Sequence, residues 1–312
     1  MNINNLVDLG DAKRKSRDFR AAILHYLKAL EQDPDHGRAL LGLADAYRGT
    51  QDAGKAIGVL ERYLDRNPKD AATLTRLADA YRKTGRRAPA EDAYRKALDL
   101  DPRNRHALMG LGDLYHRDQR YRDALVPWER LLELDPTLLN ILTMVGHMHR
   151  KQLDFEQAAQ CFARALAMAP HNPSAVFGLA DSLRGLGRFA EAAPHWEEIL
   201  RADPRNQQVL TRAGDCYFRL GQLDRAEALF SQSLDIGHDK PALLGLARIH
   251  QQRGDFPEAV RSYDRILARN PGDARTILLL AKTLERWQGP AAATAYLDQQ
   301  RKAHPEGLES NI

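Results

Sequence analysis

Apolar and small residues recur along this chain of 312 residues with the spacing of short amphipathic helices arranged in pairs. In the stretch from Ala71 to Pro102, apolar side chains stand at the fourth, seventh and eleventh positions, and alanine stands at the eighth and twentieth. At 100° per residue, the apolar positions of each half fall on one stripe of a helix. Thr84-Gly85 separates the halves, and Pro102 ends the second one. The stretch therefore predicts a hairpin of two antiparallel helices with small residues where they cross.

The same pattern occurs nine times at intervals of 34 residues, with one interval of 33. The predicted repeats begin at Ile3, Gly37, Ala71, Arg105, Leu139, Pro173, Gln207, Lys240 and Ala274. Position 20 is alanine in all nine, position 8 is glycine or alanine in all nine, and proline fills position 32 in eight. A hairpin of this size cannot bury its apolar stripe alone, so the repeats are expected to stack on one another.

The pattern resembles the tetratricopeptide repeat family, which combines leucine, glycine and tyrosine in the first helix with alanine, an aromatic residue and proline in the second. The resemblance covers residues 3 to about 307. It implies an all-α fold, a right-handed α-solenoid superhelix of antiparallel helix pairs. It also implies an interaction scaffold, because members of this family have many unrelated partners.

One irregular repeat suggests a division of the array. Repeat 7 is one residue short and has His238 where the terminating proline is expected. A missing residue at this connection should alter the rotation between repeats 7 and 8. We therefore expect residues 3–239 to hold repeats 1 to 7 and one binding surface. Residues 240–307 are expected to hold repeats 8 and 9 with a second, more basic surface, and residues 308–312 to form a C-terminal tail.

Composition favours a cytoplasmic protein without membrane insertion. The chain contains 43% hydrophobic residues, but it has no apolar run that could span a bilayer and no secretory signal pattern at its start. Cys161 and Cys216 lie in different repeats, so we expect neither a disulfide framework nor a metal cluster. The 46 basic and 42 acidic residues are interleaved, which argues against a nucleic-acid partner despite a net charge of +4. No cofactor is expected.

Two stretches resemble catalytic or metal-binding motifs. Gly49 to Ala56 nearly matches the phosphate-binding GxxxxGK[ST] loop, but alanine replaces the hydroxyl residue and a helix, not a strand, precedes it. His147 and His149 lie about 200° apart on a helix and cannot share a metal ion, whereas His116 and His147 can approach across adjacent repeats. No nucleophile, base and orienting residue occur at suitable spacing, so the sequence does not favour an enzyme.

The candidate binding surface lies on the first helix of each repeat. Positions 2, 5, 9, 12 and 13 form a stripe turned away from the core stripe. In the family this chain resembles, that stripe lines a concave groove and binds a peptide or protein segment. Position 9 is mainly aspartate here, and position 12 is mainly arginine. The charged candidates are Asp45, Arg48, Asp79, Arg82, Asp113, Arg117, His147, Arg150, Asp181, Arg184 and Asp215.

These charges allow two interpretations. An acid three residues before a base stabilises a helix by about 0.2–0.5 kcal/mol, which can explain the pattern without any ligand. Alternatively, stacking turns the pairs into a ladder of carboxylates and guanidiniums that binds the polar groups of a peptide. Surface ion pairs contribute little affinity alone, so apolar anchors are needed as well. Phe177 and Phe218 are the best candidates, because both are large and lie outside the expected packing positions.

Two alternatives compete with a general peptide-binding groove. Chaperone-binding members of the family clamp C-terminal carboxylates with lysine, arginine and asparagine, but aspartate replaces that asparagine in most repeats here and should repel an acidic tail. Self-association through the C-terminal repeat is the other alternative, because only Glu306 to Ile312 follow it and no capping helix is apparent. The sequence favours a non-enzymatic scaffold that binds a protein or peptide partner in the groove.

Overall fold

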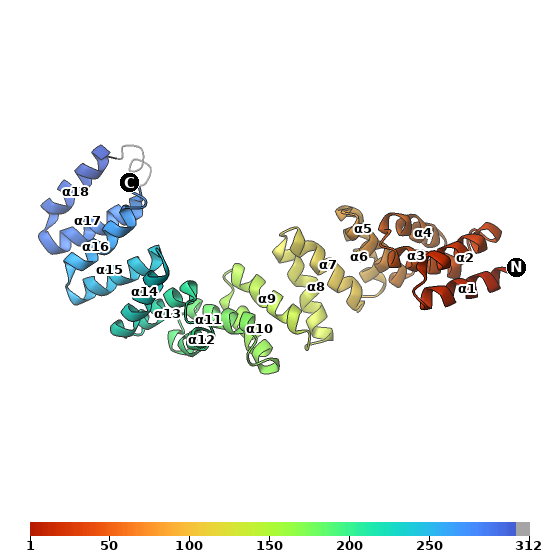
Figure 1. Cartoon of the computed structure of the whole chain (residues 1–312), viewed down its shortest axis with the longest axis horizontal. Helices are drawn as coiled ribbons and strands as arrows, with labels where there is room; N and C mark the ends of the chain where they lie inside the picture. Colours follow the sequence, from red (N-terminus) through yellow and green to blue (C-terminus); the bar gives the residue numbers. More distant parts are fainter. Residues whose placement is uncertain (304–312) are drawn as a thin grey trace. The chain divides into compact units, whose positions relative to one another are not determined.

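The computed structural model describes residues 1–303, and all regular structure in that range is helical. Figure 1 shows the helices following one another along the chain from α1 to α18. Their bounds are α1 (Ile3–Lys15), α2 (Phe19–Gln32), α3 (Gly37–Gly49), α4 (Ala53–Arg66), α5 (Ala71–Lys83), α6 (Arg87–Leu100), α7 (Arg105–Arg117), α8 (Tyr121–Leu134), α9 (Leu139–Lys151), α10 (Phe155–Met168), α11 (Pro173–Gly185), α12 (Phe189–Ala202), α13 (Gln207–Arg219), α14 (Leu223–Ile236), α15 (Lys240–Arg253), α16 (Phe256–Leu267), α17 (Ala274–Gln288) and α18 (Pro290–Ala303). The predicted all-α solenoid fold is confirmed.

The odd-numbered helices begin at the nine residues that were predicted to open the repeats. Apart from the hairpin of α9 and α10, which contains the boundary between the two units, the two helices of a hairpin pack on one another, as α1 does on α2 and α13 on α14. Within each unit the second helix of one hairpin packs on the first helix of the next, as α2 does on α3 and α12 on α13. The last repeat is described as far as residue 303, and the predicted tail, 308–312, lies outside the described residues.

The chain divides into two compact units, Met1–Met148 and the residues from His149 onward. Helices α1 to α8 belong to the first unit and α10 to α18 to the second, while α9 contains the boundary. The division predicted at residue 239 lies inside the second unit and stays a prediction.

Side chains at fixed positions begin and end the helices. Asp70 accepts a hydrogen bond from the backbone N–H of Thr73 at 3.0 Å, which satisfies one of the free donors at the start of α5. Gly85 was predicted to separate two helices, and it adopts a left-handed φ of 76° in the turn between α5 and α6. Leu153 takes a similar φ of 63° in the turn after α9 without being glycine. None of the helices in residues 1–303 is long and apolar enough to span a membrane.

The core depends on aromatic side chains that insert between the first helices of adjacent repeats. Tyr26, at position 24 of repeat 1, is fully buried, and its ring lies against Gly10 in α1 and Gly42 in α3. A Cβ atom at Gly42 would lie only 2.4 Å from Cζ of Tyr26. Phe230 of α14 lies between Gly214 and Gly245 in the same way. These glycines therefore make room for a ring, in addition to letting the helix backbones approach.

This arrangement predicts unequal costs for the same substitution at two helical glycines. Gly42→Val should lower the free energy of unfolding by about 1–3 kcal/mol more than Gly58→Val, because a larger side chain at residue 42 must displace the confined ring of Tyr26. Gly58 is exposed in α4, and a Cβ atom at this residue would have no heavy atom within 4 Å, so it controls for helix propensity. Urea unfolding followed by circular dichroism measures both values, and equal losses would contradict the packing argument.

Candidate binding face of the first helices

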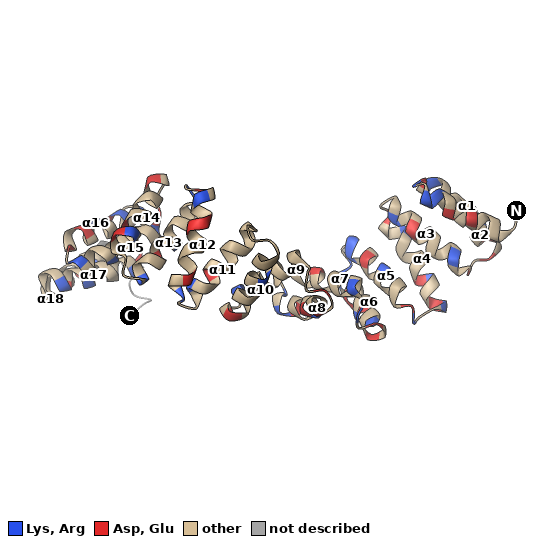
Figure 2. Cartoon of the chain, turned by 90° about the horizontal axis from the view of Figure 1, so that it is seen from below, with Lys and Arg blue, Asp and Glu red and all other residues tan. Residues whose placement is uncertain are grey.

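We call the surface formed by positions 2, 5, 9, 12 and 13 of the first helices the first-helix face. Lys and Arg residues share the helices of both units with Asp and Glu residues (Figure 2). Position 9 supplies a carboxylate in most repeats, and each of these carboxylates has its own surroundings. The differences come from the residue at position 24 and from arginines in neighbouring repeats.

In repeats 1 and 3, a buried tyrosine holds the carboxylate of position 9. The hydroxyl of Tyr26 donates to Asp11 at 2.5 Å, and Nη2 of Arg38 in the next repeat donates to the same carboxylate at 2.6 Å. Burial alone would raise the pKa of Asp11, but these hydrogen bonds outweigh burial and hold it below its ordinary value. The hydroxyl of Tyr94 contacts Asp79 in the same way. Tyrosine at position 24 is thus both a core residue and an anchor for the surface carboxylate.

Repeat 2 has leucine at position 24, and arginines surround its carboxylate instead. Asp45 lies 3.4 Å from Arg48, 3.5 Å from Arg14 in repeat 1 and 3.6 Å from Arg76 in repeat 3. Arg76 is at position 6, next to the predicted stripe. The result is three guanidinium groups around one carboxylate that is 17% exposed.

Asp113 in repeat 4 has no anchor of either kind. It is half-buried, and no hydrogen bond or ion pair joins it to another of the described residues. Burial raises the pKa of Asp113, an effect that nearby Asp79 reinforces and that Arg82, Arg117 and His116 oppose. The side chain at position 24 of this repeat is Trp128, which has no hydroxyl group to donate a hydrogen bond to the carboxylate.

In the second unit, Asp181 is the most buried carboxylate of the face, with a side chain that is 6% exposed. It forms ion pairs with Arg150, Arg184 and Arg212, and the distance to Arg184 is 2.9 Å. Burial would raise the pKa of Asp181, but the three guanidinium groups outweigh it and lower the pKa. Arg212 is at position 6 of repeat 7, as Arg76 is in repeat 3. The same combination of three arginines and one aspartate therefore occurs once in each unit.

The two aromatic candidates lie beside these charges. Phe177 is half-buried, meets the ring of Trp196 edge-on at 5.3 Å, and lies under Arg212 at 5.3 Å from the guanidinium carbon. Phe218 is also half-buried and lies under Arg248 at 4.9 Å. Both rings pack against core residues, which differs from the expectation that they lie outside the packing positions. Each presents its remaining surface next to an arginine.

The remaining candidates are less distinctive. Asp215 pairs with Arg248 at 3.3 Å, and Arg117 is exposed. His147 lies on α9 near the unit boundary. Asp52, inside the stretch that resembles a phosphate loop, caps α4 and pairs with Lys55 at 2.9 Å, so that lysine contacts a carboxylate of its own turn. Among residues 1–303, no group of three or more His, Cys, Asp or Glu side chains lies close enough to hold a metal ion.

The environment of Asp181 predicts a large effect of removing its charge. Asp181→Asn should lower the free energy of unfolding by about 3 kcal/mol, because three partly buried guanidinium groups would lose their counter-charge. Asp215→Asn is the matched control, since this aspartate is 25% exposed and has one partner, and it should cost less than about 1 kcal/mol. Chemical unfolding at pH 7 gives both values. Equal costs would show that the arginine cluster does not depend on Asp181.

Removing the charge of Asp113 should have the opposite effect to removing that of Asp181: it should raise the free energy of unfolding at pH 7, by an amount that depends on pH. Since its pKa is raised on folding, the folded chain binds the proton more tightly, and stability falls as pH rises from the unfolded value of about 4. Asp113→Asn should therefore be more stable than the wild type at pH 7, with the difference disappearing near pH 3. Asp99→Asn, at an exposed aspartate of α6, should show no such trend. Unfolding midpoints between pH 3 and 7 test this, and a gain that persists at pH 3 would rule out the titration of Asp113 as its cause.

Comparison with known proteins gives one curated relative and many solved structures. A TPR repeat-containing protein of Treponema pallidum (strain Nichols) is 33% identical over 81 residues, which are 26% of this chain and 10% of that protein. The chain thus matches only a small part of its relative. The crystal structure of MamA aligns with 55% of this chain and 95% of its own at a TM-score of 0.51 and 24% identity. YrrB, described as a TPR protein with an unusual peptide-binding site, aligns with 59% and 95% at a TM-score of 0.52 and 22% identity.

The sequence profile of the tetratricopeptide repeat matches residues 7–71, 75–138, 146–195 and 177–241, and a second profile of the same repeat matches residues 240–283. These segments cover well over half of the chain and follow the helix pairs described above. The chain therefore belongs to the tetratricopeptide repeat family.

Proposed function

We propose that this chain is a non-enzymatic, cytoplasmic scaffold that binds an acidic segment of another polypeptide on its first-helix face. Tetratricopeptide repeat proteins generally mediate protein–protein interactions, so the class of function follows from the family. The observation that supports the finer proposal is the excess of arginine around Asp45 and Asp181. At Asp181, three guanidinium groups against one carboxylate leave two positive charges. At Asp45 the excess is smaller, because Arg14 also lies 3.6 Å from Asp11.

Fixed arginines suit recognition of carboxylates. A guanidinium group donates two parallel hydrogen bonds to a carboxylate, and arginines already held by an aspartate lose little side-chain entropy on binding. Taken as isolated charges, the aspartates of position 9 were expected to repel an acidic segment. In the folded chain, however, arginines outnumber Asp45 and Asp181. Acidic side chains of a partner are thus compatible with this face.

The half-buried aromatic ring of Phe177 adds an apolar contact beside the cluster at Asp181. Affinity in protein interfaces depends on such anchors, because exposed ion pairs contribute little by themselves. The description of YrrB as a peptide-binding protein also supports a peptide as the kind of ligand. We propose an extended segment of a partner protein whose carboxylates lie against the arginine cluster of one unit.

A random peptide library displayed on phage provides the test, followed by fluorescence polarisation of each enriched peptide. The double variant Arg48→Gln/Arg184→Gln should weaken binding at least about tenfold, because it removes one guanidinium from each cluster. The matched control is Arg95→Gln/Arg225→Gln, which changes two second-helix arginines that contact tyrosines, and it should bind as the wild type does. Equal loss in both variants, or no enriched peptide, would count against this function.

Self-association is a second candidate function, favoured by the last described helix. No side chain of α18 is buried within the described residues, and Trp287 at the end of α17 is 42% exposed. Sedimentation over a hundredfold range of concentration separates the two candidates. A monomer at all concentrations disfavours assembly, whereas a dimer that Trp287→Ser dissociates would favour it.

A further inference from the structure

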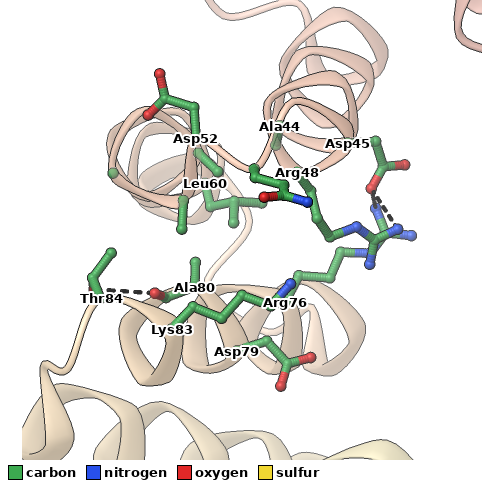
Figure 3. A pocket seen from close by; sticks show the side chains of 14 residues that line it. Ala44, Asp45, Arg48, Asp52, Leu60, Arg76, Asp79, Ala80, Lys83 and Thr84 are labelled. Atoms are coloured by element: carbon green, nitrogen blue, oxygen red, sulfur yellow. Dashed lines mark hydrogen bonds and ion pairs between the residues drawn. The ribbon is translucent and has the colours of Figure 1, made fainter. Parts of the chain in front are cut away.

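A cleft of about 480 Å³ opens on the first-helix face between repeats 2 and 3 of the first unit. Figure 3 shows α3 and α4 on one side of it and α5 on the other. Ala44, Ala56, Leu60 and Ala80 form an apolar floor, and all four are buried. Charged side chains surround the mouth, and they are Asp45, Arg48, Asp52, Arg76, Asp79 and Lys83.

The cleft exists because a side chain that recurs in other repeats is missing here. Position 17, at the start of the second helix, carries Phe19, Tyr121, Phe155, Phe189, Leu223 and Phe256 in six of the nine repeats. The ring of Phe19 reaches position 13 of the next repeat, where a Cβ atom at Gly49 would lie 2.6 Å from it. Phe155 reaches Gly185 in the same way, at 2.7 Å. Repeat 2 has Ala53 at this position, and Ala53 lines the cleft together with Lys83 at position 13 of repeat 3.

A second small side chain, at position 24 of repeat 2, makes the cleft deeper. Position 24 is aromatic in seven of the nine repeats, but in repeat 2 it is Leu60, which lies on the floor. Repeat 3 also lacks an apolar residue at position 17, yet its Arg87 reaches Asp118 of the next repeat at 2.8 Å. Repeat 2 alone combines a methyl group at position 17 with an aliphatic residue at position 24. The space that the chain fills with its own aromatic rings elsewhere is therefore open between repeats 2 and 3.

The charges at the mouth favour a negative group. Asp45 contacts three arginines, Asp52 pairs with Lys55, and Asp79 contacts Arg82 and Tyr94. Each carboxylate thus has a partner. Lys83 forms no ion pair with any residue between 1 and 303. Arg14 also pairs with Asp11, but Arg48 and Arg76 share the single carboxylate of Asp45. An acidic group at the mouth would meet unbalanced positive charge.

We propose that this cleft receives an aromatic side chain of the bound polypeptide, with an adjacent acidic residue placed against Lys83, Arg48 and Arg76. The inference rests on the proposed function and assigns to it one recognition pocket in the first unit. The ring would take the place that Phe19 and Phe155 occupy at the corresponding interfaces of their own repeats. The partner is thus a segment in which an aromatic residue stands next to aspartate or glutamate.

Short peptides test the pocket directly. The acetylated and amidated pentapeptide Gly-Asp-Phe-Asp-Gly is titrated into the full chain, and ¹³C-labelled alanine and leucine methyl signals are followed by NMR. The signals of Ala53, Ala56, Leu60 and Ala80 should shift and saturate at a Kd on the order of 1 mM. The peptide with alanine in place of phenylalanine should bind at least about tenfold more weakly, because a methyl group cannot cover the apolar floor of the cleft. The peptide with asparagine in place of both aspartates should also bind more weakly.

The matched protein variants are Ala53→Phe and Ala88→Phe. Ala53→Phe restores the side chain found in other repeats, so it should abolish the methyl shifts while leaving the unfolding midpoint unchanged or raised. Ala88→Phe introduces the same ring one position later in repeat 3, at an exposed residue outside the cleft, and should bind the peptide as the wild type does. Circular dichroism verifies that both variants are folded.

The outcomes separate this inference from the function on which it rests. Equal binding of the phenylalanine and alanine peptides, or wild-type binding by Ala53→Phe, would overturn the pocket. If the peptides selected on phage bind the wild type and Ala53→Phe equally, the pocket assignment fails while the scaffold function stands. If acetylphenylalanine amide alone binds as tightly as the pentapeptide, the acidic part of the assignment is overturned.

Discussion

The insertion of an aromatic ring between the first helices of adjacent repeats is the contact on which the rest of this structure depends. Tyr26 and Phe230 each lie against glycines from two helices, so one side chain joins the hairpin to its neighbour. Since each repeat of a solenoid contacts only the next, these rings determine how the first helices are spaced. The spacing in turn decides which side chains of the first-helix face can meet across a repeat boundary.

The charges of that face show how packing and surface chemistry are connected. Tyr26 and Tyr94 are core residues whose hydroxyl groups reach the surface and hold Asp11 and Asp79. Where the core residue is Leu60 or Trp196, the carboxylate contacts arginines from neighbouring repeats. A tyrosine at position 24 of the second helix thus supplies a hydroxyl to the position 9 aspartate, and in repeats 2 and 6, where it is absent, three arginines surround the carboxylate. Asp113 of repeat 4 has neither kind of partner within the described residues.

The start of every repeat could be predicted from the sequence, because proline at position 32 and alanine at position 20 recur at nearly constant intervals. The charged stripe was also visible at positions 9 and 12. Three features required coordinates. Arg76 and Arg212 stand at position 6, outside the predicted stripe, and join their clusters only through contacts between repeats. The hydroxyls of Tyr26 and Tyr94 point out of a core that periodicity treats as uniformly apolar. The cleft forms because Ala53 has no aromatic ring to fill the space. In the sequence, alanine at this position only makes repeat 2 fit the repeat pattern less well.

The small side chains at the interface between repeats 2 and 3 also affect the stability of the first unit. The stability of a stacked array is close to a sum over its nearest-neighbour interfaces, so the array separates first where an interface buries the least. With Ala53 and Leu60 in place of two rings, this interface lacks apolar contact that the interface between repeats 1 and 2 has. An aromatic ring bound in the cleft would supply the missing contact, because it would touch hairpin 2 and hairpin 3 at once. Binding would therefore make the unfolding of hairpin 2 more dependent on that of hairpin 3.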